Sequence, residues 1–167
     1  SVLWLLEGNG VAPANLRAAA AAAGIAPERL VFAPFAPSAE NLARLALADL
    51  GLDSLPVGAH TGASDMLWAG TPLVTCRGSA FSGRVAASLL TALELPELVT
   101  ESLAQYEALA LKLAREPQAL RALREKLAAR RSTAPLFDTA ATTRALEAAY
   151  TAMWDIHARG ETPRAFA

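Results

Sequence analysis

The sequence predicts an α/β fold in which a parallel sheet is followed by a helical C-terminal part. Short apolar runs alternate with helical patterns through the first 100 residues, and only helical patterns follow. Alternation at this spacing is typical of right-handed strand–helix–strand crossovers, which build a parallel sheet with helices on both faces. We therefore divide the chain into a sheet-containing part, 1–100, and a helical segment of the same domain, 101–167.

Short apolar runs predict the strands, and capping residues with apolar stripes predict the helices. The first run starts without a preceding cap or turn, so we expect the chain to begin partway through a domain. The predicted strands are 2–6, 30–33, 49–53, 72–76 and a short one at 97–100. The predicted helices are 13–23, one introduced by Pro37 and capped by Ser38, 65–69, 82–93 and, after residue 101, further helices of which Asp138 or Thr139 caps the last.

The composition excludes several classes of protein. The 167 residues include 15 basic and 16 acidic side chains, a net charge of −1, so strong binding to nucleic-acid phosphates is not expected. One cysteine forms neither an internal disulfide nor a cysteine-based zinc cluster. No run of about 18 apolar residues indicates a membrane span, and the N-terminus lacks a secretory-signal pattern. We therefore expect a cytoplasmic protein with neither a nucleic-acid partner nor a membrane span.

A loop rich in glycine and small residues, 56–64, carries the strongest local indication of binding. Thr61 and Gly62 lie near its end and lead into the helix predicted at 65–69, so backbone amides without a helical partner face outward. Such amides suit a phosphate or diphosphate, because small residues let the oxygens approach the backbone closely. The alternative is a glycine that serves the geometry of the turn alone.

Asp65 and His60 flank this turn, and each has two interpretations. Asp65 falls in the first turn of the predicted helix, where its carboxylate either accepts hydrogen bonds from a ribose diol or only adds a favourable charge near the helix dipole. His60 either donates to a phosphate oxygen or a departing diphosphate, or is an ordinary turn residue. The two histidines show no metal-ligand spacing with other residues, so no metal site is expected.

A charged segment lies between residues 112 and 131, where basic side chains outnumber acidic ones. We interpret it as a solvated helix face, with an anionic membrane or another subunit as the alternative partner. The basic residues are Lys112, Arg115, Arg121, Arg124, Lys126, Arg130 and Arg131, and the acidic ones are Glu116 and Glu125.

The stretch that contains the turn, residues 60–75, reads HTGASDMLWAGTPLVT. It resembles the C-terminal catalytic, nucleotide-sugar-binding half of the O-GlcNAc transferase family, bacterial type. The resemblance covers nearly the whole chain. The supporting segments are 1–6, Ala36–Pro37, 83–88, 132–137 and Met153–Trp154.

This resemblance implies a GT-B architecture, in which two Rossmann-like domains face each other across a cleft. The chain would supply most of the C-terminal, UDP-sugar-binding domain, incomplete at its N-terminus. The family transfers N-acetylglucosamine from UDP-GlcNAc to serine or threonine of proteins, and it uses no metal and no other cofactor. We therefore expect an enzyme, a glycosyltransferase.

The resemblance also assigns roles to single residues. Ala36 would meet the uracil through its backbone, while Ser38 and Asn41 stand where animal members carry a lysine and a uracil-stacking histidine. Thr61 and Gly62 would cradle the diphosphate, although Gly62 replaces a second threonine of animal members. Beside them, His60 would contact the leaving group and Asp65 would hold the ribose hydroxyls. No other residue of the chain is assigned to catalysis.

The partners implied are a UDP-sugar, an acceptor protein, and an N-terminal catalytic domain with a helical-repeat region, upstream or on another chain. The catalytic base and the lysine that neutralises the diphosphate would lie upstream, so the chain alone is expected to be inactive. The helical tail is expected to pack on the other half of the enzyme. Two alternatives remain: a related GT-B enzyme with another UDP-sugar donor, such as UDP-glucose, or a non-catalytic interaction domain on the same fold.

Overall fold

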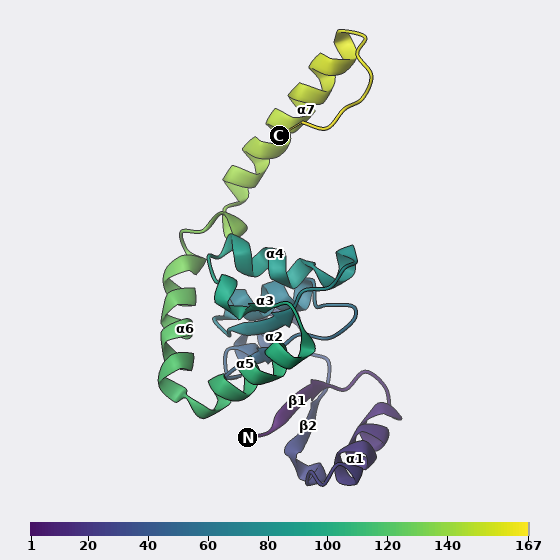
Figure 1. The fold of residues 1–167 in the computed structure, drawn as a ribbon, viewed down its shortest axis with the longest axis vertical. Coiled ribbons are helices and arrows are strands. Elements are labelled where there is room, and N and C mark those ends of the chain that lie inside the picture. The colour runs from purple at the N-terminus through teal and green to yellow at the C-terminus, as the bar shows by residue number, and fades with distance from the viewer. Residues whose placement is uncertain (167) are drawn as a thin grey trace. The chain divides into compact units, whose positions relative to one another are not determined.

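The structure, a computed structural model, describes residues 1–166 and divides into two compact units (Figure 1). The first unit is Ser1–Arg44, and the second begins at Leu45 and includes every helix after residue 100. Both units contain parallel strands joined by helices, which confirms the predicted α/β class. Within the described residues, no helix combines the length and the apolar character needed to cross a membrane.

The first unit is a two-stranded parallel sheet with one long connecting helix. Its strands β1 (Leu3–Leu6) and β2 (Leu30–Ala33) pair over their full length. The connecting helix α1 (Ala12–Ala22) is followed by Gly24, whose φ of +73° lies in the left-handed region that glycine enters without strain. These three elements lie within one residue of their predicted bounds. The unit ends in α2 (Ser38–Leu45), whose last residue opens the second unit.

The second unit is built on three parallel strands with β4 in the centre. The helix α3 joins β3 to β4, and α4 joins β4 to β5. The core lies around the central strand, where Val74 is fully buried. The elements are β3 (Gly51–Leu52), α3 (Thr61–Ala69), β4 (Leu73–Cys76), α4 (Val85–Ala92) and β5 (Val99–Thr100). The large side chains with 0 or 1% exposure include Leu67, Leu73, Leu90, Leu93, Leu95, Leu98 and Leu127.

Several predicted bounds differ from the structure. The strand predicted at 49–53 contains only two ladder residues, because the chain leaves β4 after the Asp53 amide bonds to the Val74 carbonyl. The ladders of residues 1–166 form two sheets, β1–β2 and β3–β4–β5, where alternation had predicted one. The helix predicted at 82–93 is a single 3₁₀ turn, Phe81–Gly83, followed by α4.

The helices of the C-terminal part are α5 (Leu103–Arg115), α6 (Pro117–Arg131) and α7 (Thr139–Ala158). Asp138 caps α7, since its Oδ1 accepts a hydrogen bond from the Ala141 amide at 2.8 Å. From there α7 extends away from the rest of the second unit (Figure 1). Four of its large apolar side chains are each at least 50% exposed, whereas Ile156 near its end is 7% exposed. The four are Leu146, Tyr150, Met153 and Trp154.

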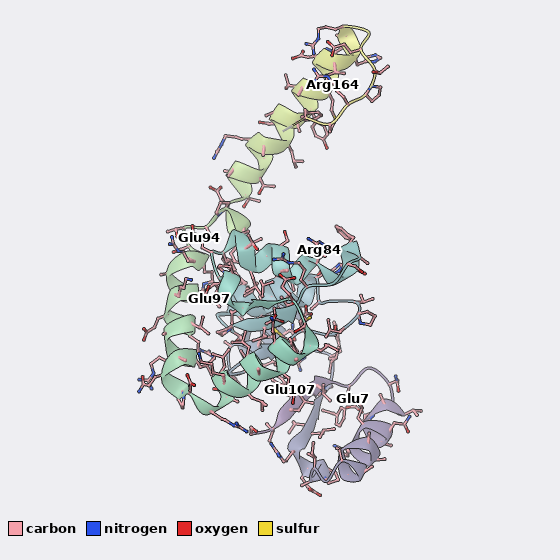
Figure 2. All side chains as sticks on the ribbon, viewed as in Figure 1. Glu7, Arg84, Glu94, Glu97, Glu107 and Arg164 are labelled. Carbon is pink, nitrogen blue, oxygen red and sulfur yellow. The ribbon has the colours of Figure 1, made fainter. Side chains whose placement is uncertain are left out.

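The basic face of α6 is not simply solvated, which corrects the prediction. Arg124 donates to the carbonyls of Ala46, Ala48 and Asp49 at 2.7–3.2 Å, beyond the end of α2, and Arg131 donates to the Trp68 carbonyl near the end of α3. Both arginines therefore donate hydrogen bonds to backbone carbonyls at or just beyond the C-terminal ends of helices, where no helical amide is available to do so. Glu94 and Glu97, labelled beside α6 in Figure 2, each pair with one further cation of this face. These ion pairs are Arg130–Glu94 at 2.7 Å and Lys126–Glu97 at 2.6 Å.

Candidate functional site

The turn predicted to bind phosphate is the first turn of α3. The helix begins at Thr61, four residues earlier than predicted, and its first internal hydrogen bond runs from the Ser64 amide to the His60 carbonyl at 3.1 Å. The amides of Thr61, Gly62 and Ala63 precede that bond and have no carbonyl acceptor within the helix. The predicted start lay too far along the chain because it was placed from the apolar stripe by which a helix packs. The first turn of α3 consists of small residues and adds little to that stripe.

The earlier start of α3 moves Asp65 into the second turn of the helix, so the predicted place in the first turn is wrong. The attraction of the helix dipole falls off within the first turn, which weakens the purely structural interpretation of this carboxylate. Asp65 is partly buried, and no side chain of residues 1–166 pairs with it. It lies four residues after Thr61, so the two side chains share one face of the helix.

His60 occupies the cap position of α3 with its ring exposed. Its Nε2 lies 3.1 Å from the Ser82 carbonyl oxygen, and its ring meets Phe81 edge-on with 6.1 Å between centroids. A carbonyl oxygen only accepts hydrogen bonds, so Nε2 carries the proton. In the neutral ring Nδ1 is then an acceptor, and it donates to a phosphate oxygen only when the imidazole is protonated.

The backbone of Gly62 is open on the side where a side chain would project. A Cβ built there meets only the Cβ of Ala59, at 4.0 Å. The fold therefore does not require glycine at this position. The open space leaves room for a ligand to reach the backbone, which is the property that the small residue was predicted to supply.

Asp53 is a buried carboxylate in the loop before α3, and the sequence analysis treated it only as the end of a strand. It is 6% exposed, and its carboxylate accepts three hydrogen bonds from neutral donors. The sequence held one indication of this, an acidic residue that leaves a predicted strand and enters a glycine-containing loop. The donors are the Ser54 amide at 2.9 Å, the Ala59 amide at 2.6 Å and the Thr75 hydroxyl at 2.6 Å.

A second loop, between β4 and α4, supports the first. The Ser82 carbonyl accepts from the Gly58 amide at 2.9 Å as well as facing His60. A Cβ added to Gly83 would lie 2.9 Å from the Pro56 carbonyl oxygen, so the two backbones can come this close only with glycine there. The two loops therefore form one support beside the start of α3.

Tyr106 on α5 contacts the same support from the core side. Its hydroxyl donates to the Asp53 carbonyl at 2.9 Å. Burial raises the pKa of Tyr106 to about 12, and the negative charges of Asp53 and Cys76 add to the effect. The phenol is thus kept protonated, which is the form that donates this hydrogen bond.

The residues expected to contact the uracil base lie in the first unit. Ala36 is 5% exposed, and Ser38 is the exposed first residue of α2. Pro37 occupies the cap position, since its carbonyl accepts from the Asn41 amide at 2.8 Å, so the prediction of Ser38 as the cap is wrong. The partly buried Asn41 accepts at Oδ1 from Arg44 at 3.1 Å.

Of the predicted site residues, the structure groups four at the start of α3: His60, Thr61, Gly62 and Asp65. Ala36, Ser38 and Asn41 lie together around the start of α2 in the other unit. Within residues 1–166, no three His, Cys, Asp or Glu side chains gather in a metal-binding arrangement.

Comparison with known protein families matches residues 1–146 to glycosyl transferase family 41. A protein of Arabidopsis thaliana, named a probable UDP-N-acetylglucosamine–peptide N-acetylglucosaminyltransferase, is 38% identical over 99% of this chain and 17% of its own length. The UDP-N-acetylglucosamine–peptide N-acetylglucosaminyltransferase of Caenorhabditis elegans is 36% identical over 83% of this chain and 12% of its own length.

Among solved structures, an O-GlcNAc transferase of Thermobaculum terrenum, determined as a mutant, matches with a TM-score of 0.85 and 34% identity. The match covers 92% of this chain and 30% of the other. The chain therefore spans less than a third of the length of each of these relatives.

Proposed function

Since the chain belongs to glycosyl transferase family 41, we propose that it is the UDP-sugar-binding part of a protein O-glycosyltransferase. The complete enzyme transfers N-acetylglucosamine from UDP-GlcNAc to serine or threonine hydroxyls of acceptor proteins. The names of the relatives support the donor and the reaction. In this chain the proposal depends on one observation, the row of unpaired amides that opens α3.

In this proposal the start of α3 binds the diphosphate of the donor. The amides of Thr61, Gly62 and Ala63 point at the oxygens that gain charge as UDP leaves, and fixed donors stabilise that charge without reorganising. Protonated His60 donates to the same group from Nδ1, while the Ser82 carbonyl holds its Nε2–H. Asp65 accepts hydrogen bonds from the ribose diol. We assign contact with the uracil to Ala36, Ser38 and Asn41.

The remaining parts of the enzyme complete the reaction. An N-terminal catalytic domain supplies the catalytic base and further charge neutralisation, and a helical-repeat region engages the acceptor protein. The exposed apolar side chains of α7 support a further contact between this helix and the other half of the enzyme. Transfer proceeds without a metal, because backbone amides, a histidine and the other half of the enzyme balance the charge. A cytoplasmic location belongs to the same proposal.

The test is a calorimetric titration of the intact enzyme with UDP in the presence of EDTA. Asp65→Ala is expected to weaken UDP binding by about 10- to 100-fold, since hydrogen bonds to a charged group contribute about 1.5–3 kcal/mol. Glu107→Ala is the matched control, because Glu107 is an exposed carboxylate on α5 (Figure 2). Unchanged affinity in Asp65→Ala rejects the ribose assignment.

Turnover assays then identify the donor. We expect the intact enzyme to use UDP-GlcNAc in preference to UDP-glucose, with transfer to a protein hydroxyl. Preference for UDP-glucose would assign the chain to a related GT-B enzyme. A wild-type enzyme that shows no UDP-induced thermal shift would instead indicate an interaction domain that has lost its ligand.

A further inference from the structure

The side chain of Asp53 links the loop before α3 to the core of the second unit. Asp53 follows β3, and its backbone amide donates to the Val74 carbonyl at 3.0 Å. From that point the chain runs through Ser54–Ala59 and reaches His60, the cap residue of α3. We propose that Asp53 is a positioning residue for nucleotide diphosphate binding, which it serves by fixing this loop and so the amides that open α3. This inference rests on the proposed function.

One oxygen of Asp53 closes the loop. Oδ1 accepts from the amide of Ser54, where the loop begins, at 2.9 Å and from the amide of Ala59, where it ends, at 2.6 Å. Ala59 directly precedes His60, so the second bond fixes the backbone one residue before the helix. A loop whose two ends share an acceptor has few other arrangements that leave no buried amide unpaired.

The other oxygen of Asp53 connects the loop to the central strand. Oδ2 accepts from the Thr75 hydroxyl on β4 at 2.6 Å, and Thr75 is fully buried. Tyr106 holds the Asp53 carbonyl from α5 at 2.9 Å. The carboxylate therefore transmits the position of the most buried strand of the second unit to the loop, through hydrogen bonds made on both of its oxygens.

The loop also packs directly against the carboxylate. A Cβ added to Gly58 would lie 3.0 Å from Asp53 Oδ2 and 3.3 Å from the Ser82 carbonyl oxygen. The Gly58 backbone thus fills the space between the carboxylate and the second loop. Removing the carboxylate leaves a gap at this contact and two unpaired loop amides, so the start of α3 loses its fixed position.

The experiment measures the affinity of the intact enzyme for UDP and for inorganic diphosphate, alongside thermal stability. Asp53→Ala is expected to weaken the binding of both ligands by about 10- to 100-fold, since loss of one hydrogen bond from these amides to the charged diphosphate has an effect of this size. Leu127→Ala on α6 is the matched control, because it loses stability in the core of the same unit without touching the loop. It is expected to bind both ligands like the wild type at temperatures where it is folded.

Asp53→Asn tests rescue by a conservative change. The amide oxygen still accepts from Ser54 and Ala59, and the Thr75 hydroxyl rotates to accept from the new NH₂ group. We expect its affinity for both ligands to stay within about threefold of the wild type, a change smaller than one hydrogen bond. Gly58→Ala disturbs the contact between the loop and the Asp53 carboxylate from the loop side. It is expected to weaken the binding of both ligands while the core remains folded.

Two outcomes overturn the inference. One is a folded Asp53→Ala enzyme whose affinity for UDP and diphosphate equals that of Leu127→Ala. The other, which decides the case if Asp53→Ala does not fold, is a folded Gly58→Ala enzyme with wild-type affinity. Both outcomes count against the inference only when the wild type binds UDP and Asp65→Ala weakens that binding. Failure of those two conditions counts against the proposed function instead.

Discussion

The first and second units differ in how much apolar surface each buries around its strands. In the first unit the buried residues are few and mostly small, namely Pro13, Ala20, Leu30 and Ala36. The second unit surrounds its central strand with leucines that are almost entirely inaccessible to solvent. Since hydrophobic stabilisation scales with the apolar area removed from water, the second unit has the larger share of the stability.

This difference also separates the two segments to which the proposed function assigns the diphosphate and the uracil. The start of α3 is backed by a dense core and by the Asp53 hydrogen bonds, so its geometry is set before a ligand arrives. The segment around Asn41 is held mainly by Arg44, which donates to Asn41 Oδ1 and to the Pro34 carbonyl at 2.7 Å. Regions with few buried contacts open locally at lower free energy. We therefore expect the start of α3 to be the more rigid of the two segments and the segment around Asn41 to be the more adaptable.

The largest expected effect tests the difference in the cores. Leu67→Ala on α3 removes a fully buried side chain and is expected to lower the free energy of unfolding by about 2–5 kcal/mol in urea titration. Leu30→Ala is the counterpart in the first unit, where Leu30 is 8% exposed, and its cost is expected near the lower end of this range. A larger cost for Leu30→Ala would reverse the comparison between the units.

An intermediate effect is expected from Asn41→His, which introduces an aromatic ring where the family resemblance implies a uracil-stacking histidine in animal members. The variant is expected to bind UDP about fivefold more tightly, near the lower end of about 1–3 kcal/mol for stacking on a base. Affinity for inorganic diphosphate should not change, because the substitution lies in the base segment. Asn41→Ala is the control for loss of the side chain, and an equal gain for both ligands would contradict the interpretation.

The smallest effect concerns alkaline pH and the second unit alone. Tyr106 has its pKa raised to about 12 in the folded protein from the ordinary value of 10.0, mainly by burial. Between these values the unfolded chain loses the phenolic proton while the folded chain retains it, so stability is complete below pH 10 and falls as the pH rises towards 12. Chemical denaturation at several pH values should show a shallower decline for Tyr106→Phe. Parallel curves for the two proteins would contradict the assignment.

The sequence was sufficient for the family, the α/β class and several elements. The strand at 30–33 is reproduced without change because an apolar run bounded by turn residues has few other interpretations. The resemblance based on residues 60–75 is confirmed by the family match over residues 1–146. Local patterns and family motifs are both properties of short stretches, which is why a single sequence reveals them.

What the sequence missed depends on contacts between distant stretches. Asp53 gains its importance from Thr75 and Tyr106, which are 22 and 53 residues away, and no local pattern connects them. Arg124 was placed on a solvated face because its carbonyl partners are 75–78 residues away. Pairing of strands into two sheets is likewise a property of the tertiary structure, which local alternation of helices and strands does not specify.

The indole of Trp154 projects from α7 and is 66% exposed. Tryptophan emission shifts to shorter wavelengths when water around the ring is replaced by another surface. Trp68 is 49% exposed and lies edge-on against the Phe137 ring, with 5.0 Å between centroids. The apolar face of α7 thus contains an intrinsic fluorophore, and its emission wavelength depends on whether that face is exposed to water or covered by another surface.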